Sequence, residues 1–543
     1  MARFSRRVFA VSVAAALGAV TLQAGHGVRP GTTPGTYQGP SSSETPYVVP
    51  TQDGWGAVSL LTVGDGAEEN GYRMVGIPDG LGAMPGRFTR GRYRYDKDYM
   101  TVFMNHELGS TAGVVRDHGA KGAFVSQWTV DLDSLEVEQG QDLIQDVYTW
   151  DATNHRYVYA NNTPEATFNR FCSADLPASR AFYNPRTRKG FAGRIYTNGE
   201  ESGNEGRAFA HVVTGGKKGS TYQLPYLGRF SWENSVAHPS AGDTTIVAGL
   251  DDSTPGQVHI YVGEKRRRGN PVERAGLQGG KLFGVKVTDG GANYGNLPAP
   301  LENNGAVNGV FTLMDVSDVA TGSGAALQAT SVERGITEWA RPEDGAWDRN
   351  DPKVFYFVTT GAIGQTSRLY KLRLNSLVNP TGGTVEMVVD SASLTGKDGE
   401  VARTFDNITV DGAGRVLIQE DPGGAAYLAK TWRVDPSDPL AAQDIAASDP
   451  ARFAAGAPLG TNEESSGIIE ITTLVKHAWW YDKGRRYYLA DMQAHYDIGD
   501  PELVEGGQLY MLVSPKGRYH HDDDDNDEDG WDDDRGDRDD DQH

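Results

Sequence analysis

The sequence predicts an all-β protein, both from its composition and from paired strand signals. The chain has 543 residues, including 68 glycines and 26 prolines. Tyr, Val and Thr are abundant, whereas long periodic runs of Leu, Ala, Glu and Lys are few. Short strands joined by tight turns have this composition, and a chain of this length can bury a sizeable core.

Pairs of short alternating runs recur between residues 46 and 515. Many hairpins without alternating helices predict a β-propeller of about six blades, with a pair of β-sandwiches as the alternative. The long intervals 106–126, 160–195 and 262–330 are expected to be loops inserted between blades. The paired or single runs are 92–105, 244–250 with 257–262, 354–360 with 367–374, 407–410 with 415–419, and 508–513.

The first 27 residues are predicted to be a twin-arginine export signal. Arg6-Arg7 precede a mildly apolar stretch at 11–22, and a general secretory signal is the alternative. The twin-arginine machinery exports folded proteins, so the protein is expected to fold first and then reach the periplasm or the outside of the cell. Neither this stretch nor a later one is long and apolar enough to predict a membrane span.

The remaining chain divides into three predicted parts. Residues 28–45, rich in Pro, Gly, Ser and Thr, are expected to form a flexible linker, and residues 46–515 the propeller. Residues 516–543 are predicted to be a disordered acidic tail, because 14 acidic residues and two arginines occur from Asp522 onward. The tail supplies −12 of the formal net charge of −22, and no basic stripe for nucleic acid occurs elsewhere.

Cys172 is the single cysteine of the chain. An exported protein with one thiol has no internal disulfide framework. The thiol is therefore either a small buried apolar group or a metal ligand or nucleophile.

Acidic residues stand beside Asn, Arg and His at the ends of several predicted strands. In a propeller the strand ends of different blades converge on one axis, so these side chains are expected to surround a single cavity. Clustered carboxylates repel one another unless cations neutralise them, and Ca²⁺ accepts six to eight carboxylate and carbonyl oxygens. The segments are Asn105-His106-Glu107, Glu200-Glu201, Glu233-Asn234, Arg341-Pro342-Glu343-Asp344, Asp406-Asn407 and Glu420-Asp421.

At these positions the sequence resembles the PhoX alkaline phosphatases, over residues 50–513. The matching segments occur in the family's order, and the last two are the most specific. They are FMNHELG at 103–109, RFCSADLP at 170–177, NGEESGN at 198–204, GRFSWENSVAHP at 228–239, EWARPEDGAWD at 338–348 and FDNITVDGAGRVLIQED at 405–421.

The resemblance implies an exported, metal-dependent phosphatase that hydrolyses phosphate esters with Ca²⁺ and Fe³⁺ ions in a central propeller site. It makes Cys172 a candidate iron ligand, and Arg341 and Asn105 candidate phosphate-binding groups. Phosphoryl transfer requires mainly positioning and charge neutralisation, which metals and a guanidinium supply. The further metal ligands that the resemblance implies are Glu107, Glu200, Glu201, Glu233, Glu343, Asp406, Glu420 and Asp421.

Two other functions stay open. Ser231-Trp232 stand where the family commonly has Lys-His, so a phosphate-facing cation is missing there. The chain could therefore be a non-catalytic calcium-binding surface propeller. It could also be another metal-dependent propeller hydrolase, such as a lactonase or a phytase-like esterase.

Overall fold

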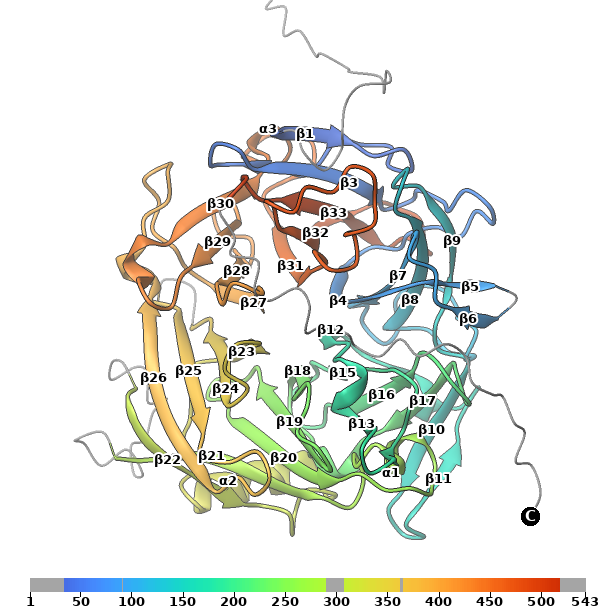
Figure 1. Ribbon diagram of the computed structural model, residues 1–543, viewed down its shortest axis with the longest axis vertical. Coiled ribbons are helices and arrows are strands. Elements are labelled where there is room, and N and C mark those ends of the chain that lie inside the picture. Colours follow the sequence, from blue (N-terminus) through green and yellow to red (C-terminus); the bar gives the residue numbers. More distant parts are fainter. Residues whose placement is uncertain (1–33, 90, 290–306, 362–364, 518–543) are drawn as a thin grey trace, which may run out of the picture.

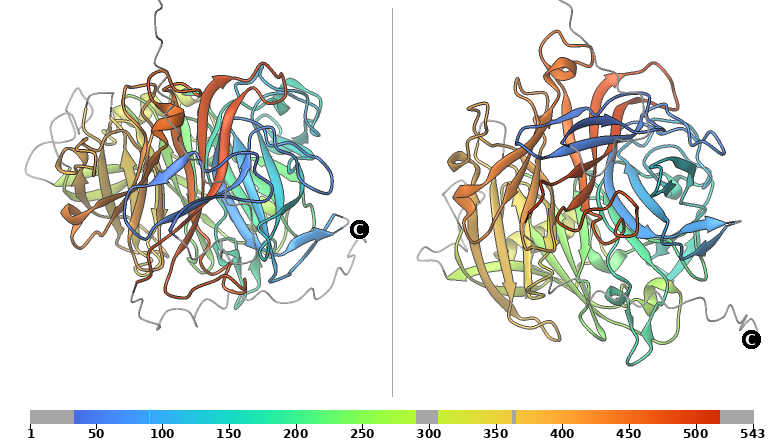
Figure 2. Two further views of the ribbon diagram at one scale, coloured as in Figure 1. Left: turned by 90° about the horizontal axis from the view of Figure 1, so that it is seen from above. Right: turned by 45° about the horizontal axis from the view of Figure 1, so that its top comes forward.

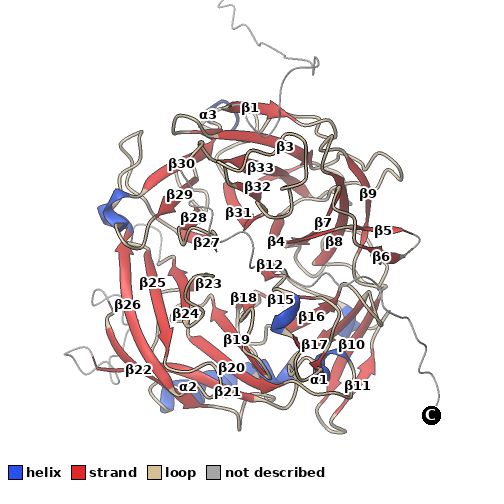
Figure 3. Ribbon diagram, in the orientation of Figure 1, coloured by secondary structure: helices blue, strands red, loops and turns tan. Residues whose placement is uncertain are grey.

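The computed structural model describes residues 34–89, 91–289, 307–361 and 365–517. The predicted signal at 1–27 and the acidic part of the tail lie outside these residues. The described residues form a β-propeller of six blades around one axis (Figure 1). Helices are short and lie mostly at the periphery (Figure 3), where they are α1 (Pro271–Arg274), α2 (Gly324–Glu333) and α3 (Pro450–Phe453).

The first three blades follow one another along the chain, and their strands are antiparallel except for the parallel pair β10–β17. The strands of these blades come from segments whose side chains alternate with a period of two residues. Most residues of the inner strands are buried on both faces of the sheet. Blade 1 contains β4 (Pro78–Pro85), β7 (Tyr99–His106), β8 (Phe124–Asp131) and β9 (Val137–Asp142). Blade 2 contains β12 (Phe171–Asp175), β15 (Ile195–Glu200), β16 (Ala208–Val212) and β17 (Ser220–Gln223), extended by β10 (Asp146–Asp151) and β11 (Arg156–Tyr159). Blade 3 contains β18 (Trp232–Ala237), β19 (Thr244–Asp251), β20 (Val258–Glu264) and β21 (Lys281–Asp289).

The other three blades complete the circle. β22 (Gly309–Asp315) pairs with both β21 and β26 and so joins blades 3 and 4 into one sheet. Blade 4 contains β23 (Pro342–Trp347), β24 (Val354–Thr359), β25 (Arg368–Leu374) and β26 (Gly382–Asp390). Blade 5 contains β27 (Phe405–Val410), β28 (Val416–Glu420), β29 (Lys430–Val434), β30 (Gln443–Ser448) and β2 (Val48–Pro50). Blade 6 contains β31 (Glu463–Glu470), β32 (Tyr487–Asp497), β33 (Glu505–Val513), β3 (Gly56–Thr62) and β1 (Gly35–Gln38).

One strand from each blade lines the axis. β4 contacts β12, and contacts continue through β18, β23, β27 and β31 back to β4. Figure 1 shows these six labels around the centre, and the view from above in Figure 2 shows the blades side by side around the axis. All six strands run in the same direction along the axis, so they begin at one face of the propeller, here called the strand-start face, and end at the strand-end face.

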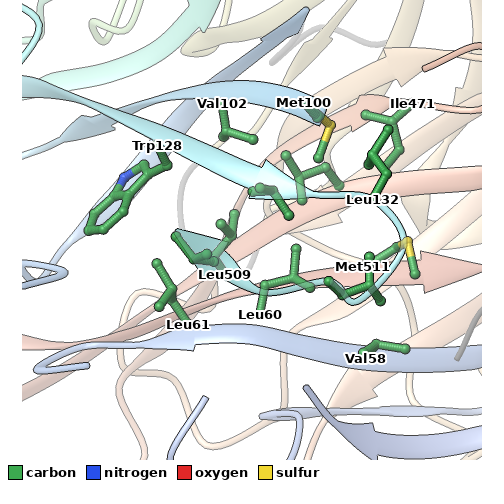
Figure 4. Packing of buried hydrophobic residues seen from close by; sticks show 14 of the residues in the cluster. Val58, Leu60, Leu61, Met100, Val102, Trp128, Leu132, Ile471, Leu509 and Met511 are labelled. Atoms are coloured by element: carbon green, nitrogen blue, oxygen red, sulfur yellow. The ribbon is translucent and has the colours of Figure 1, made fainter. Parts of the chain in front are cut away.

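The circle closes inside blade 6, where strands from both ends of the chain pair. β3 pairs antiparallel with β33, and an apolar cluster fills the space between blades 6 and 1. Figure 4 shows Leu60 and Leu61 of β3 packed near Leu509 and Met511 of β33, with Trp128 of β8 alongside. This burial stabilises the junction at which the ring would otherwise be open.

The sequence placed the hairpins β19–β20, β24–β25 and β27–β28 correctly, whereas the run 92–105 divides between β6 (Arg92–Arg94) and β7, which do not pair, and two other predictions were wrong. Residues 34–45 are not a linker: β1 pairs in parallel with β3, and the buried Ser42 hydroxyl lies 3.0 Å from the Thr62 hydroxyl. The interval 160–195 is not merely an inserted loop, since it contains the axial strand β12, and 262–330 contains β21 and β22. β1 and β12, with four and five residues, are too short to leave much periodic signal. The longest helix of the described residues, α2, has ten residues, too few to cross a bilayer.

Candidate metal centre

The second residue of every axial strand carries a group that can bind a metal ion. Together these side chains form a ring at the strand-start end of the axis. They are Asp79 of β4, Cys172 of β12, Glu233 of β18, Glu343 of β23, Asp406 of β27 and Glu464 of β31. We call these six residues the axial ring.

An irregularity in each axial strand accompanies the ring. In β4, β12, β18, β23 and β27 the pairing with the next strand skips from the first residue to the fourth, as from Pro342 to Gly345. In β31 the skip lies between Ser465 and Ile468. Such bulges bend a strand and redirect its side chains, and they are frequent beside functional sites.

The residue before four of the axial strands has a left-handed backbone. Ile77, Arg170, Arg341 and Thr404 have φ values of 50°, 52°, 60° and 46°. This conformation is unfavourable for residues with a Cβ, above all for β-branched Ile77 and Thr404, and persists only where the surrounding structure enforces it. The same turn thus starts the strands in four blades and presents the side chains of Arg170 and Arg341 at the strand-start face.

Three groups of possible ligands overlap along the ring. Asp79, Glu107 and Cys172 form the first group, and Glu201 and Glu233 join Cys172 in the second. The third group contains Glu233 with Glu343 and Asp406, and in every group the ligand atoms lie within 4.8 Å of one another. Because Cys172 and Glu233 each belong to two groups, the ligand atoms form one continuous chain across the axis.

Burial makes this concentration of acids costly. Asp79 is fully buried and Glu233 and Glu343 are each 1 % exposed. Loss of solvent, and then the neighbouring carboxylates, raise the pKa values of Asp79, Glu343 and Asp406 well above the ordinary range. Burial likewise raises the pKa of Glu233 to about 8 and raises the pKa of the Cys172 thiol. Carboxylates so close together cannot all ionise unless cations lie among them.

Two guanidinium groups lie at the mouth of the ring. Arg170 Nε donates to Glu107 Oε1 at 2.8 Å, and its Nη2 also bonds Glu201. Arg341 holds Asp252 with both arms of its fork, at 2.7 and 2.9 Å, and lies 3.1 Å from Glu343. The Arg170 and Arg341 side chains remain 49 % and 34 % exposed, so both can still meet a ligand from solvent.

A third cation supports the ring from blade 6. His495 Nδ1 lies 2.7 Å from Glu505 and its Nε2 lies 3.8 Å from Glu464. Burial alone would lower the pKa of His495, but the bonds to Glu464 and Glu505 prevail and raise it to about 10. The positive charges of these three side chains are too few to balance the negative charges of the acids. Those acids are the carboxylates of the three groups and also Asp252 and Glu464.

Polar side chains form a second layer directly beyond the ring, at the third residue of the axial strands. Ser173 Oγ donates to Glu233 Oε1 at 2.5 Å and lies 2.6 Å from the Asn407 side-chain amide. Asn234 Nδ2 donates to Asp344 Oδ1 at 2.6 Å. These bonds link blades 2, 3, 4 and 5, and the bond from Ser173 orients Glu233 of the ring.

The structure brings most of the predicted site residues together. Asp421 borders the ring, and burial, with Glu464 nearby, raises its pKa to about 7. Arg341 lies beside Glu343 of the third group. The predicted residues that belong to the three groups are Glu107, Cys172, Glu201, Glu233, Glu343 and Asp406.

Three predicted residues lie elsewhere and have other partners. Glu200 points away from the axis and forms an ion pair with Arg207 at 2.7 Å. Glu420 accepts from Trp432 Nε1 at 2.9 Å and from two backbone amides, so its oxygens are already occupied. Asn105 is fully buried, and its Nδ2 donates to the Cys172 carbonyl at 2.6 Å; it positions β12 rather than facing the mouth.

Sequence reasoning missed Asp79, Asp252 and Glu464. Asp79 and Glu464 each stand at the second position of an axial strand, as the other ring residues do. This pattern can be recognised only when the bounds of the strands are known. Asp252 follows β19 as the second of two consecutive aspartates and shows no such pattern.

The residues present suit bound metal ions. The buried Gln493 Oε1 has no hydrogen-bond partner in the described part of the chain, although its Nε2 donates to Asp79 at 2.8 Å and to Glu107 at 2.9 Å. An amide oxygen left unpaired beside acids is suited to a cation. The all-oxygen group of Glu233, Glu343 and Asp406 matches the preference of Ca²⁺, and the two groups with a thiolate match softer transition metals.

Comparison with known proteins shows the fold. No family model and no curated protein sequence matches the chain. Among solved structures, Pseudomonas fluorescens PhoX in complex with vanadate is similar with a TM-score of 0.53 and 13 % identity, covering 90 % of this chain and 98 % of that one. A GH43 β-1,3-galactosidase matches with a TM-score of 0.30 and 12 % identity, over 83 % of this chain and 94 % of that one. The likeness to PhoX agrees with the β-propeller described above.

Proposed function

We propose that the chain is a metal-dependent phosphatase that hydrolyses phosphate esters at the axial ring. The observation that carries this proposal is the buried ring of ligands with two half-exposed guanidinium groups, Arg170 and Arg341, at its mouth. The similarity to a solved phosphatase described with vanadate, a transition-state analogue, supports the same reaction class.

The ligand groups differ in the metals that they would hold. Cys172 belongs to two adjacent groups, so its thiolate would help to hold a transition metal there, for which iron is our proposal. Glu233, Glu343 and Asp406 would bind calcium. When bound, these ions would neutralise the carboxylates and stabilise the negative charge that develops on a transferred phosphoryl group.

The side chains of the protein itself bind and orient the ester. Arg341 and Arg170 precede β23 and β12, the two axial strands on either side of β18, so their guanidinium groups approach from two sides of Glu233. A guanidinium can bind two phosphate oxygens at once. Asp252, 6 % exposed, holds Arg341 through both oxygens, which restricts the guanidinium to one orientation. Phosphoryl transfer gains most from such positioning.

A non-catalytic calcium-binding propeller is the second candidate. Ser231 precedes β18, in the place that Arg170 and Arg341 occupy before their own strands, and it is 4 % exposed. A positive charge between the two arginines is therefore absent at that position. In this case the ring would serve only to stabilise the fold.

The deciding experiment measures metals and turnover on one sample. Protein purified after export should contain iron and calcium and should release phosphate from an aryl phosphate. Arg341→Ala should lower kcat/KM by about two orders of magnitude, because a charged hydrogen bond to the substrate is lost. Calcium without iron, together with no turnover, would instead establish the second candidate.

A further inference from the structure

A cavity lies on the axis on the side of the polar layer that faces away from the metal centre, and Ser173, Asn234 and Asn407 of that layer belong to its lining. It has a volume of about 1040 Å³ and is lined by the later residues of the axial strands, from Asn234 to Ala237 of β18 and from Gly467 to Glu470 of β31 among others. It therefore opens at the strand-end face. The axial ring and its two arginines lie at the other end of the axis.

The lining of this cavity is basic. Its walls carry three carboxylates, from Asp175, Asp344 and Glu470. Asp344 accepts hydrogen bonds from Asn234 and from the backbone amide of Ile408, and burial raises the pKa of Asp175 to about 7. The cations in the walls are Lys97, Arg180, Arg194, Arg349, Lys476 and Arg486.

Four of these cations interact with acids of the protein, among them Arg194, which acts on Asp175. Glu470 pairs with Arg486 at 2.6 Å and with Arg349 at 3.5 Å, and Lys97 lies 3.5 Å from Asp98. Arg194 donates to the carbonyl of Pro177 at 2.7 Å. Arg180 and Lys476 are exposed and come from two different blades. The positive potential of the cavity thus survives the internal pairing and would attract an anion.

The described chain ends beside this cavity. β33 runs parallel to the axial strand β31 through two antiparallel pairings, so it ends at the strand-end face. Gly517 N bonds Gly484 O at 2.7 Å, and Lys516 pairs with Asp482 at 3.0 Å. Both partners belong to the segment 471–486, which also supplies Lys476 and Arg486 to the cavity wall.

We propose that the acidic segment 522–543 of the same chain binds in this cavity. The segment has 14 acidic residues and two arginines. Asp522 is five residues beyond Gly517, and five extended residues span about 17 Å, enough to bring the first carboxylates to the mouth. Because the tail is tethered beside the cavity, its effective concentration there is high. This inference does not depend on the proposed phosphatase activity.

Carbodiimide cross-linking of the full chain tests the proposal, because it joins an amine to a carboxylate without a spacer and so couples groups that come into direct contact. Mass spectrometry should find Lys476 coupled to acids of 522–543. The yield should fall at least about fivefold between 50 and 500 mM NaCl, because salt screens exposed charge pairs. Exposed Lys121, between β7 and β8 at the strand-start face, is the control amine and should not couple.

Charge variants make the test specific. Arg180→Gln leaves Lys476 in place and should lower its coupling yield by half or more, whereas Arg268→Gln, an exposed residue between β20 and α1, should leave the yield unchanged. The proposal is overturned if Lys476 couples no more than Lys121, or if both variants act alike. It is also overturned if the coupling joins two chains and grows with protein concentration.

Discussion

Asp252 and Arg341 illustrate how single side chains define the metal centre. The carboxylate meets both arms of the guanidinium, and the left-handed backbone at Arg341 directs that side chain to the mouth of the ring. An arginine held in this way loses little conformational freedom when it binds a ligand.

Asp252→Asn should therefore weaken substrate binding. We expect KM for an aryl phosphate to rise roughly tenfold with a smaller change in kcat, because one charged bond that orients Arg341 is lost. Asp318→Asn is the matched control. Both oxygens of Asp318 accept hydrogen bonds from the guanidinium of Arg334 at 2.7 Å, but this pair lies far from the ring. An unchanged KM would show that Asp252 does not position Arg341.

Cys172→Ser should separate the two kinds of metal. A hydroxyl is a poor ligand for transition metals, so bound iron should fall by about tenfold or more while calcium is retained. Elemental analysis measures both metals, and circular dichroism checks the fold. Ser331→Ala, at a buried serine of α2, is the control and should change neither metal. Equal loss of iron and calcium would contradict separate sites.

At the scale of elements, the close approach of axial strands depends on a glycine. Gly80 is the third residue of β4, and a Cβ there would lie 2.4 Å from the Ala174 backbone nitrogen of β12. Neither strand can move without disturbing Asp79 or Cys172, which are adjacent in the ring. The pair therefore couples backbone packing to metal binding.

Gly80→Ala should lower both stability and metal content. Overpacking of this kind costs about 1–3 kcal/mol, so Tm should fall, and displaced ligands should release iron first. Gly109→Ala is the control, because a Cβ at Gly109 meets nothing within 4 Å. Thermal unfolding and metal analysis check the result; equal behaviour of the two variants would disprove the coupling.

The sequence predicted several hairpins with regular alternation and missed the shortest axial and edge strands. The hairpins β19–β20, β24–β25 and β27–β28 were recognisable because each strand alternates and a turn separates the pair. β12 has five residues and a bulge, and β1 has four, so neither forms a pattern longer than a chance run.

For the site, the chemistry of residues was predictable but their direction was not. Glu200 and Glu201 are adjacent in sequence, yet only Glu201 belongs to a ligand group, because Glu200 is the last residue of β15 and pairs with Arg207, whereas Glu201 lies just beyond the strand. Glu420 was selected for its acidity, while its buried oxygens accept bonds from Trp432 and the backbone. Only the folded structure, through the partners of each carboxylate, distinguishes these cases.

At the scale of the whole molecule, we expect the ring to make stability depend on the proposed metals and on pH. Without ions the ring consists of buried acids whose folded pKa values are raised, that of Glu233 from 4.5 to about 8. Between these two values the native state holds protons that the unfolded state has released, so stability is lost as the pH rises.

Metal-free protein should therefore unfold more easily at pH 8 than at pH 5. We expect Tm in excess chelator to fall by about 5 °C or more over this range, since one buried group contributes about 1.4 kcal/mol per unit of pKa shift. Added calcium should raise Tm at pH 8 and reduce the pH dependence, because it replaces the protons. Scanning calorimetry at several pH values measures this, and a Tm that rises with pH in chelator would refute it.

The pairing of β3 with β33 has a consequence for biosynthesis. Glu464 and the strands that close blade 6 come from the last fifth of the chain, whereas β3 is made near the beginning. A nascent chain on the ribosome can assemble only an open arc of blades until β33 emerges. The complete axial ring therefore exists only after translation has nearly finished, so we expect the proposed metals to be loaded after translation.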